Sequence, residues 1–374
     1  MMNLQPMTRA PALPNSCYIT NQRLVDPRTG MEVQPPTEPE LNQYFFMDKE
    51  GLHSKEVSTS ITVVRNAERN NVIYDILTSE GQYIFTALMR ATIMNDTKTV
   101  KALLSAEATM ALPNGVTALM LAAHLGHADC VSLLMSKEAG LQQKNGNTAL
   151  MEAVQNGNVE IVKILAPREA GSRRRDGWTA LMTAAEYGIE DAVKILMKTE
   201  AGIQTRSGVT ALMVAAGNGF TNIVKLLAPS EKGLKTLAGW TALMGAVEEK
   251  HFDSAAILVS HEAKLTKMDG WTALMSAARH GLYDIARLLA PHEAGMVCPA
   301  DNSCALMWAA SAGSRDICEL LLDKENHIRN KQGFKAIDFA RDAGHTDLLM
   351  LLSGEEADTS IQKKKKKGKK EAKK

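Results

Sequence analysis

The side chains best suited to catalysis or metal binding in this 374-residue chain are scattered. His124 and His127 have a spacing of three, but Gly126 predicts that a helix ends between them, so they would not share one face. Cys298 and Cys304 share a predicted loop without a second pair of ligands. The chain also lacks a Gly-x-Ser-x-Gly motif and a phosphate-binding loop. We therefore expect no catalytic, cofactor-binding or metal-binding residues, and a protein that is not an enzyme.

A repeated tetrapeptide indicates the elements that position every side chain of interest. Thr-Ala-Leu-Met occurs seven times at intervals of 31 residues, beginning at Thr86, Thr117, Thr148, Thr179, Thr210, Thr241 and Thr272. Two weaker copies begin at Cys304 and Lys335. A constant period of this size is typical of a stacked array of small units. Residues 86–353 are therefore predicted to form an all-α solenoid of about nine helix-turn-helix repeats.

Each repeat has its own start and stop signals. In the fourth, Gly177 marks a tight turn, Thr179 is a good N-cap, and Gly188 predicts a left-handed helix end. A second helix follows and ends near a glutamate that recurs in eight repeats: Glu107, Glu138, Glu169, Glu200, Glu231, Glu262, Glu293 and Glu325. We assign these glutamates to the architecture of the unit, because their spacing suggests no catalytic pairing.

The N-terminal part of the chain lacks the repeat. Residues 1–40 hold seven of the twelve prolines, so residues 1–56 are expected to be largely disordered. Helical spacing then returns in residues 72–77, where Val72, Ile73, Ile76 and Leu77 are apolar. Residues 57–85 are therefore predicted to be a degenerate helical cap that covers the apolar end of the array.

The C-terminal residues 354–374 are predicted to be a disordered tail rich in lysine. Residues 363–374 contain nine Lys and one Glu and so carry +8, although the formal charge of the whole chain is only +1. Such a tail suits a nuclear import signal, or contact with nucleic acid or an acidic protein surface. A tail that merely solubilises the chain is the alternative.

The composition suits a reducing compartment. The five cysteines are scarce and odd in number, which does not suggest a disulfide framework. No apolar run is long enough to cross a membrane, and residues 1–10 lack a secretory signal. We expect a monomeric array in the cytoplasm, with association with the cytoskeleton or a nuclear location as alternatives.

These units resemble ankyrin repeats, in which Thr-Pro-Leu-His opens the first helix and the period is about 33 residues. Here Ala replaces Pro, Met replaces His, and the period is 31. The variant Gly-Trp-Thr-Ala-Leu-Met, with Glu-Ala-Gly at the end of the unit, is similar to a large ankyrin-repeat family of flagellate protists. Some members carry a kinase domain of the Nek type, whose Gly-rich loop and His-Arg-Asp motif this chain lacks.

The resemblance implies where a partner would bind. In ankyrin proteins partners meet the turn tips and the inner helix surface, and the residue before each Thr lies on that surface. The candidates at this position are Val116, Trp178, Val209, Trp240 and Trp271. Variable inner-helix positions and a basic turn add Tyr187, Arg279, His280 and Arg175. Trp is a common interface anchor, and Arg pairs well with carboxylates.

Each candidate also has a purely structural interpretation. The Trp side chains could pack onto the neighbouring turn, and the arginines could simply be solvated. Pro167, Pro229 and Pro291, which are predicted to end second helices, lie 62 residues apart. This longer period indicates growth by copying a two-repeat block, so the Trp residues could also be inherited without selection for binding.

The sequence thus favours a protein–protein interaction scaffold or adaptor that binds protein partners on the concave surface of turns and inner helices. One alternative is a targeting protein in which the lysine-rich tail binds an anionic partner. Another is a regulatory subunit that acts in trans on a kinase, which only the domain pairings of the protist family suggest.

Overall fold

The structure is a computed structural model that describes residues 85–354 together with the backbone of seven strands before them. These strands are β1 (Tyr18–Thr20), β2 (Arg23–Val25), β3 (Phe46–Met47), β4 (Leu52–His53), β5 (Ser60–Asn66), β6 (Asn71–Thr78) and β7 (Gly81–Ile84). Most of the segment expected to be disordered, residues 1–56, and the lysine-rich tail beyond residue 354 lie outside the described residues.

The predicted helical cap over residues 57–85 is wrong. Strands β5, β6 and β7 form an antiparallel sheet there, and β1–β2 and β3–β4 form two antiparallel pairs before it. The residues that suggested a helix lie in β6 (Asn71–Thr78). A short run rich in β-branched residues fits a strand as well as a helix, and pairing with two neighbours decides in favour of the strand.

From residue 85 to residue 354 the described chain contains helices and no strand, which confirms the all-α array of nine repeats. The first helices are α2 (Ala87–Ile93), α4 (Ala118–Leu125), α6 (Ala149–Gln155), α8 (Ala180–Tyr187), α10 (Ala211–Gly217), α12 (Ala242–Glu248), α14 (Ala273–Arg279), α16 (Ala305–Ser311) and α18 (Ala336–Asp342). The second helices are α3 (Thr97–Glu107), α5 (Ala128–Glu138), α7 (Val159–Glu169), α9 (Glu190–Glu200), α11 (Thr221–Glu231), α13 (Phe252–Glu262), α15 (Tyr283–Glu293), α17 (Arg315–Glu325), and the pair η1 (Thr346–Leu348) and α19 (Leu349–Ser353).

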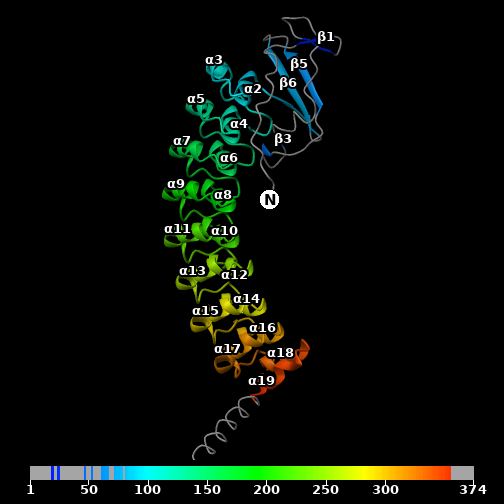
Figure 1. Ribbon diagram of the computed structural model, residues 1–374, viewed down its shortest axis with the longest axis vertical. Coiled ribbons are helices and arrows are strands. Elements are labelled where there is room, and N and C mark those ends of the chain that lie inside the picture. The colour runs from blue at the N-terminus through cyan, green and yellow to red at the C-terminus, as the bar shows by residue number, and fades with distance from the viewer. Residues whose placement is uncertain are drawn as a thin grey trace, which may run out of the picture. The chain divides into compact units, whose positions relative to one another are not determined.

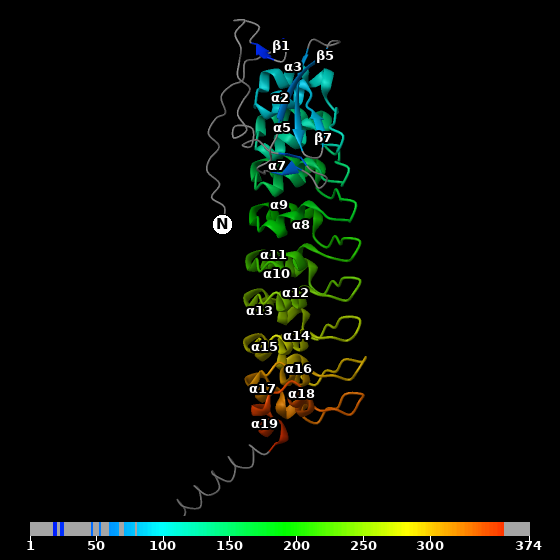
Figure 2. The same ribbon diagram turned by 90° about the vertical axis from the view of Figure 1, so that its right-hand side faces the viewer.

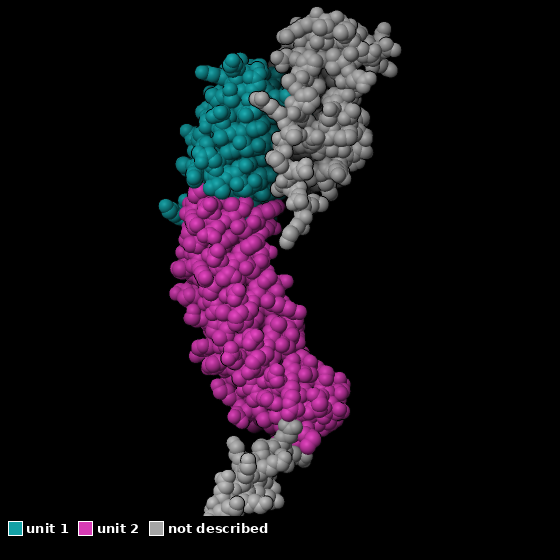
Figure 3. Space-filling view, viewed as in Figure 1, with its two compact units in different colours: residues 1–184, 198–200 teal, residues 185–197, 201–374 magenta. Residues whose placement is uncertain are grey.

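The chain divides into two compact units (Figure 3). Unit 1 holds residues 1–184 and 198–200, and unit 2 holds residues 185–197 and 201–374. Within unit 2 the first helices α10, α12, α14 and α16 stack in one layer, and α11, α13, α15 and α17 stack in a second (Figure 1). The loops between successive repeats of this unit project on one side of the helix pairs (Figure 2).

The predicted helix signals are confirmed. The Thr148 hydroxyl accepts a hydrogen bond from the Met151 N–H at 3.4 Å, and five other repeats make the same N-cap. Leu150 and Ala153 of α6 are buried, and Gly157 after this helix has φ of 70°. The prediction that Pro167, Pro229 and Pro291 end second helices is wrong, because these prolines lie inside α7, α11 and α15, each of which continues for two more residues. So close to the end of a helix, the lost hydrogen bond and the ring disturb only the last turn.

A buried glutamate joins the parts of eight of the nine repeats. Glu169, at the end of α7, is 1% exposed. One carboxylate oxygen accepts from the Leu150 N–H in the first turn of α6 at 2.7 Å, and the other accepts from the Gly140 N–H of the preceding repeat at 3.0 Å. The Thr148 hydroxyl also hydrogen-bonds to this carboxylate. The carboxylate therefore holds the two helices of its own repeat together and ties them to the repeat before.

The arrangement recurs along the array. The glutamates that make both backbone contacts, at distances between 2.6 and 3.1 Å, are Glu138, Glu169, Glu200, Glu231, Glu262, Glu293 and Glu325. Glu107 makes the contact to its own first helix, with Leu88. The interpretation of this series as architecture is therefore confirmed by its geometry, since each carboxylate accepts hydrogen bonds from backbone donors of the fold.

Burial raises the pKa of most of these carboxyl groups, and the hydrogen bonds from backbone N–H groups oppose that shift without cancelling it. The groups with a raised pKa are Glu138, Glu169, Glu200, Glu231, Glu293 and Glu325. Each carboxylate is thus costly to hold charged, and each depends on its donors.

Glu169→Gln tests the bridging carboxylate at constant side-chain volume. The amide replaces one acceptor by a donor that would face a backbone N–H, so we expect a loss of about 1–3 kcal/mol in the free energy of unfolding. Thermal and urea unfolding followed by circular dichroism measure this change. Glu160→Gln on the same helix is the matched control, because the Glu160 side chain is 74% exposed, and it should change stability by less than about 0.5 kcal/mol. Equal effects of the two variants would refute the bridging role.

The raised pKa values also predict how stability depends on pH. A carboxyl group that titrates higher in the native than in the unfolded chain contributes stability below its unfolded pKa, and this contribution disappears as the pH rises through the native pKa. We therefore expect the glutamate series to stabilise the array less at about pH 7.5 than at about pH 5. Comparing Glu169→Gln with the parent at both pH values isolates the effect, since the variant should show the smaller decline. A steeper decline in the variant would contradict this assignment.

Candidate functional site

One pair of positions shapes the surface of several first helices. In three repeats the residue before the N-cap and the residue four after the N-cap are in contact, as in a hydrophobic staple. The Trp178 indole N–H donates to the Thr183 hydroxyl at 3.0 Å. Trp271 makes the same bond to Ser276 at 2.8 Å. These bonds fix the orientation of each indole ring on its own helix, so we call the two positions the staple pair.

The structure separates the candidates that precede the N-cap into two groups. Trp178, Val209, Trp240 and Trp271 are half-buried and retain an accessible face. Val116 is 0% exposed and lies in the core, so its prediction as a contact residue is wrong. Side-chain size alone does not explain the difference, because Val209 is also a valine. The second position of the pair differs: it is the fully buried Leu121 for Val116 and the half-buried Val214 for Val209.

Three repeats of unit 2 bring aromatic and cationic side chains together. The Lys267 ammonium lies 4.4 Å from the ring centroid of Trp240 and 5.3 Å from that of Trp271. The Trp271 and Trp308 rings are 4.9 Å apart at an interplanar angle of 58°. Both contacts fall within the usual range for cation–π and tilted aromatic pairs. We call these four residues the Trp–Lys cluster.

An ion-pair network borders the Trp–Lys cluster. The Arg279 guanidinium stacks 5.5 Å from the centroid of Trp271 and pairs with Glu248 of the preceding repeat. His280 contacts the same Glu248 oxygen at 3.2 Å. Burial alone would raise the pKa of Glu248, but hydrogen bonds from His280 and Ser276 and the charge of Arg279 together lower it. The structure thus joins Trp240, Trp271, Arg279 and His280, four of the candidates from the sequence.

Sequence reasoning missed Lys267 and Trp308. Trp308 occupies the second position of its staple pair, and the first is the small Ser303. In Trp271 and Ser276 the Trp comes first and the small residue second, so Ser303 and Trp308 have the opposite order. The sequence alone shows this reversal. The Trp308 indole N–H is buried and has no hydrogen-bond acceptor among the described residues. The contact of Lys267 with Trp240 crosses between repeats, so no local pattern indicates it.

Two apolar side chains stand out on the loops beside the cluster. Leu237 is 74% exposed and Met268 is 82% exposed. The Met268 N–H donates to the carbonyl of Ala238 at 3.3 Å, so the loops that carry them are hydrogen-bonded neighbours. An exposed apolar pair of this kind is a feature of binding surfaces.

The remaining candidates lie outside this cluster. Arg175 is exposed on its loop in unit 1, where its backbone N–H donates to the Asn145 carbonyl at 3.2 Å. In the same basic turn Arg174 pairs with Asp176 at 3.6 Å. Tyr187 is 49% exposed in unit 2. These positions are accessible, and their role in binding stays a prediction.

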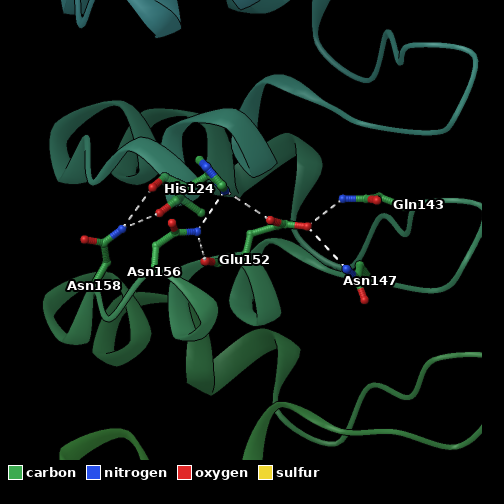
Figure 4. A network of polar contacts seen from close by, with 7 residues as sticks. His124, Gln143, Asn147, Glu152, Asn156 and Asn158 are labelled. Atoms are coloured by element: carbon green, nitrogen blue, oxygen red, sulfur yellow. Dashed lines mark hydrogen bonds and ion pairs between the residues drawn. The ribbon is translucent and has the colours of Figure 1, made fainter. Parts of the chain in front are cut away.

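Unit 1 carries a polar version of the staple pair (Figure 4). Asn147 and Gln143 donate to one oxygen of the buried Glu152, at 3.3 and 2.7 Å, and His124 contacts the other oxygen at 3.3 Å. Asn156 lies 2.8 Å from the same nitrogen of His124. The carboxylate thus links a loop to two first helices from inside the fold.

The residues considered for metal binding have other partners. His124 faces Glu152, whereas the His127 ring contacts the Thr92 carbonyl at 2.8 Å. Cys298 and Cys304 are buried, and burial raises the pKa of the Cys304 thiol to about 12. Among the residues the structure describes, no group of three or more His, Cys, Asp or Glu side chains could hold a metal ion. In the same part of the chain no helix is both long and apolar enough to cross a membrane.

Comparison with known protein families gives a match over nearly the whole array. A family model described as ankyrin repeats (3 copies) matches residues 88–173, 167–236, 228–299 and 290–363. These matches overlap and together span more than half of the 374-residue chain. Comparison with curated proteins finds no match.

Trp271→Phe and Trp308→Phe form a matched pair that tests the indole hydrogen bond. Both changes remove the same atoms, but only the first breaks a bond, since the Trp308 N–H has no acceptor. We expect Trp271→Phe to lower the free energy of unfolding by at least about 1 kcal/mol more than Trp308→Phe. Thermal unfolding followed by near-ultraviolet circular dichroism measures the difference. A larger loss for Trp308→Phe would show that ring packing, and not the bond, dominates.

Proposed function

Because this chain belongs to the ankyrin-repeat family, whose repeats form a protein–protein interaction module, we propose that the array is a non-enzymatic scaffold or adaptor. It binds a protein partner on its loops and first helices. The observation that carries this proposal is the Trp–Lys cluster, which presents three half-buried indoles on adjacent repeats.

The cluster has the properties of a binding anchor. Trp is enriched among residues that dominate binding energy, and such residues act best when they are held in place before the partner arrives. The staple bond from Trp271 to Ser276 and the tilted contact with Trp308 hold these rings. Little conformational entropy would then be lost on binding, because the side chains are already ordered.

Replacing the three predicted anchors tests the proposal. We expect Trp178→Ala, Trp240→Ala and Trp271→Ala together to reduce recovery of specific partners from cell extract by at least about tenfold. Affinity purification with mass spectrometry measures the recovery, and circular dichroism verifies that the helical signal persists. A collapse of that signal would show that the Trp residues are structural.

The matched control removes three exposed side chains from the second helices. Lys163, Lys225 and Arg287 are exposed there, and their replacement by Ala should leave recovery unchanged. If this control loses the same proteins, or if the Trp variant loses none, the first helices are not the binding surface and the proposal fails.

The charged tail supports a second candidate function. Residues 363–374 carry +8, which would attract an anionic partner and direct the protein to the nucleus or the cytoskeleton instead of leaving it in the cytoplasm. Deleting these residues should then change its location in cells. The third alternative, regulation of a kinase in trans, rests only on the resemblance to the 31-residue repeat family of flagellate protists.

A further inference from the structure

We propose that the Trp–Lys cluster binds an acidic partner segment in which carboxylate side chains alternate with aliphatic ones, and that Lys267 receives a carboxylate. This inference rests on the proposed function, because it names the chemistry of the partner for the same surface. It follows from the state of Lys267, the charge of the loops and the apolar residues beside them.

The Lys267 ammonium lacks an anionic partner. It lies between the rings of Trp240 and Trp271 and has no hydrogen bond or ion pair within the described residues. Indole faces hold a cation in place without neutralising it, and Lys267 as a residue is half-buried between them. A carboxylate that approaches this ammonium would therefore form a charge-assisted hydrogen bond in a partly dry site.

The acidic groups near Lys267 have partners other than its ammonium. Glu248 on α12 is already engaged by Arg279 and His280, so its charge is compensated. Asp269 is two residues from Lys267, but its carboxylate accepts from the Trp271 backbone N–H at 2.9 Å. Neither carboxylate pairs with Lys267, although Asp269 keeps its negative charge and only one Glu248 oxygen is engaged.

The loops between repeats of unit 2 are positive as a set. Residues 203–208, 234–239, 265–270, 296–302 and 328–333 contain five Lys or Arg and two Asp, for a net charge of +3. The remainder of the chain before the tail is negative, because the formal charge is +1 and the tail supplies +8. Outside the tail, the loop edge as a whole is therefore the part of this unit that would attract an acidic segment, with the excess positive charge on the outer loops at Arg206, Arg329 and Lys331. The three loops next to the cluster, residues 234–239, 265–270 and 296–302, sum to zero, so the attraction at the cluster itself rests on Lys267.

Apolar contacts complete the surface. Leu237 and Met268 are mostly exposed on adjacent loops, one on each side of Trp240 in the sequence. Aliphatic side chains of a partner would cover them, while a neighbouring carboxylate reaches Lys267. A cationic ligand such as a methylated lysine is disfavoured, because Lys267 already occupies the space between the two indoles.

Fluorescence anisotropy with short labelled peptides tests the proposal on the full-length chain. The probe alternates Glu with Leu, and matched peptides carry Gln, Lys or phosphoserine in place of Glu. We expect the Glu peptide to bind, the Gln and Lys peptides to bind at least about tenfold more weakly, and Lys267→Met to weaken the Glu peptide about tenfold. Met keeps an apolar, polarizable contact with the indoles, so the cluster should stay packed.

Lys225→Met is the matched control. It removes the same charge from the exposed face of α11 and should change affinity by less than about twofold. Peptide binding that neither variant affects would place the interaction on the tail and overturn the proposal. Equal binding of the Glu and Gln peptides, or no binding of the Glu peptide, would also overturn it. A phosphoserine peptide that binds more than about tenfold tighter than the Glu peptide would replace carboxylate by phosphate as the ligand.

Partner recovery separates this inference from the proposed function. In the affinity purification, loss of partners with the triple Trp variant but full recovery with Lys267→Met would leave the scaffold proposal intact and refute the carboxylate contact. Full recovery with both variants would refute both. Loss with both, and unchanged recovery with Lys225→Met, is the expected result.

Discussion

One buried carboxylate in each of eight repeats is the interaction on which this fold depends. Glu169 and its counterparts accept from the first turn of the first helix with one oxygen and from the preceding repeat with the other. An isolated helix of seven residues, such as α6, would be marginal in water, so its stability must come from such contacts and from packing. A negative charge at the N-terminus of that helix also interacts favourably with its dipole. Because the bond to the preceding repeat spans 29 residues in most repeats, the carboxylate also helps to set the distance between units.

A frame fixed in this way allows the staple pair to vary. In the third repeat the pair is Asn147 and Glu152, and the buried charge of Glu152 is satisfied by amides and by His124 (Figure 4). In the seventh repeat the same positions hold Trp271 and Ser276, with a single bond between them. The Asn147–Glu152 pair keeps its hydrogen-bonding groups inside the fold, whereas the Trp271–Ser276 pair leaves one face of the indole ring at the surface. The chemistry available to a partner therefore changes along the array although the backbone does not.

The sequence predicts what is local and periodic here. The Thr caps, the positive φ of glycines such as Gly188 and the positions of the glutamates each follow from a few residues in a row. Side-chain contacts between repeats do not follow from the local sequence. Lys267, for example, contacts Trp240, which lies 27 residues earlier in the chain. Val116 shows the opposite failure, since its position in the repeat suggested exposure and it is fully buried, whereas Val209 at the same position is half-buried. The strands β5–β7 were missed because short β-branched segments fit two periodicities, and only pairing decides between them.

Neighbouring loops of unit 2 are hydrogen-bonded to one another, and this matters for binding. The Leu237 N–H donates to the Ser207 carbonyl at 2.9 Å, the Met268 N–H to Ala238 at 3.3 Å, and the Lys331 N–H to Asp301 at 2.8 Å. Each loop is thereby held to the one before, so the exposed Leu237 and Met268 are presented on a hydrogen-bonded edge. Exposed apolar side chains on mobile loops would lose conformational entropy when a partner orders them, and side chains on a tethered edge lose less. The buried glutamate sets the distance between repeats, and the loop hydrogen bonds align the loop tips. Both therefore reduce the conformational entropy that the protein loses when a partner binds.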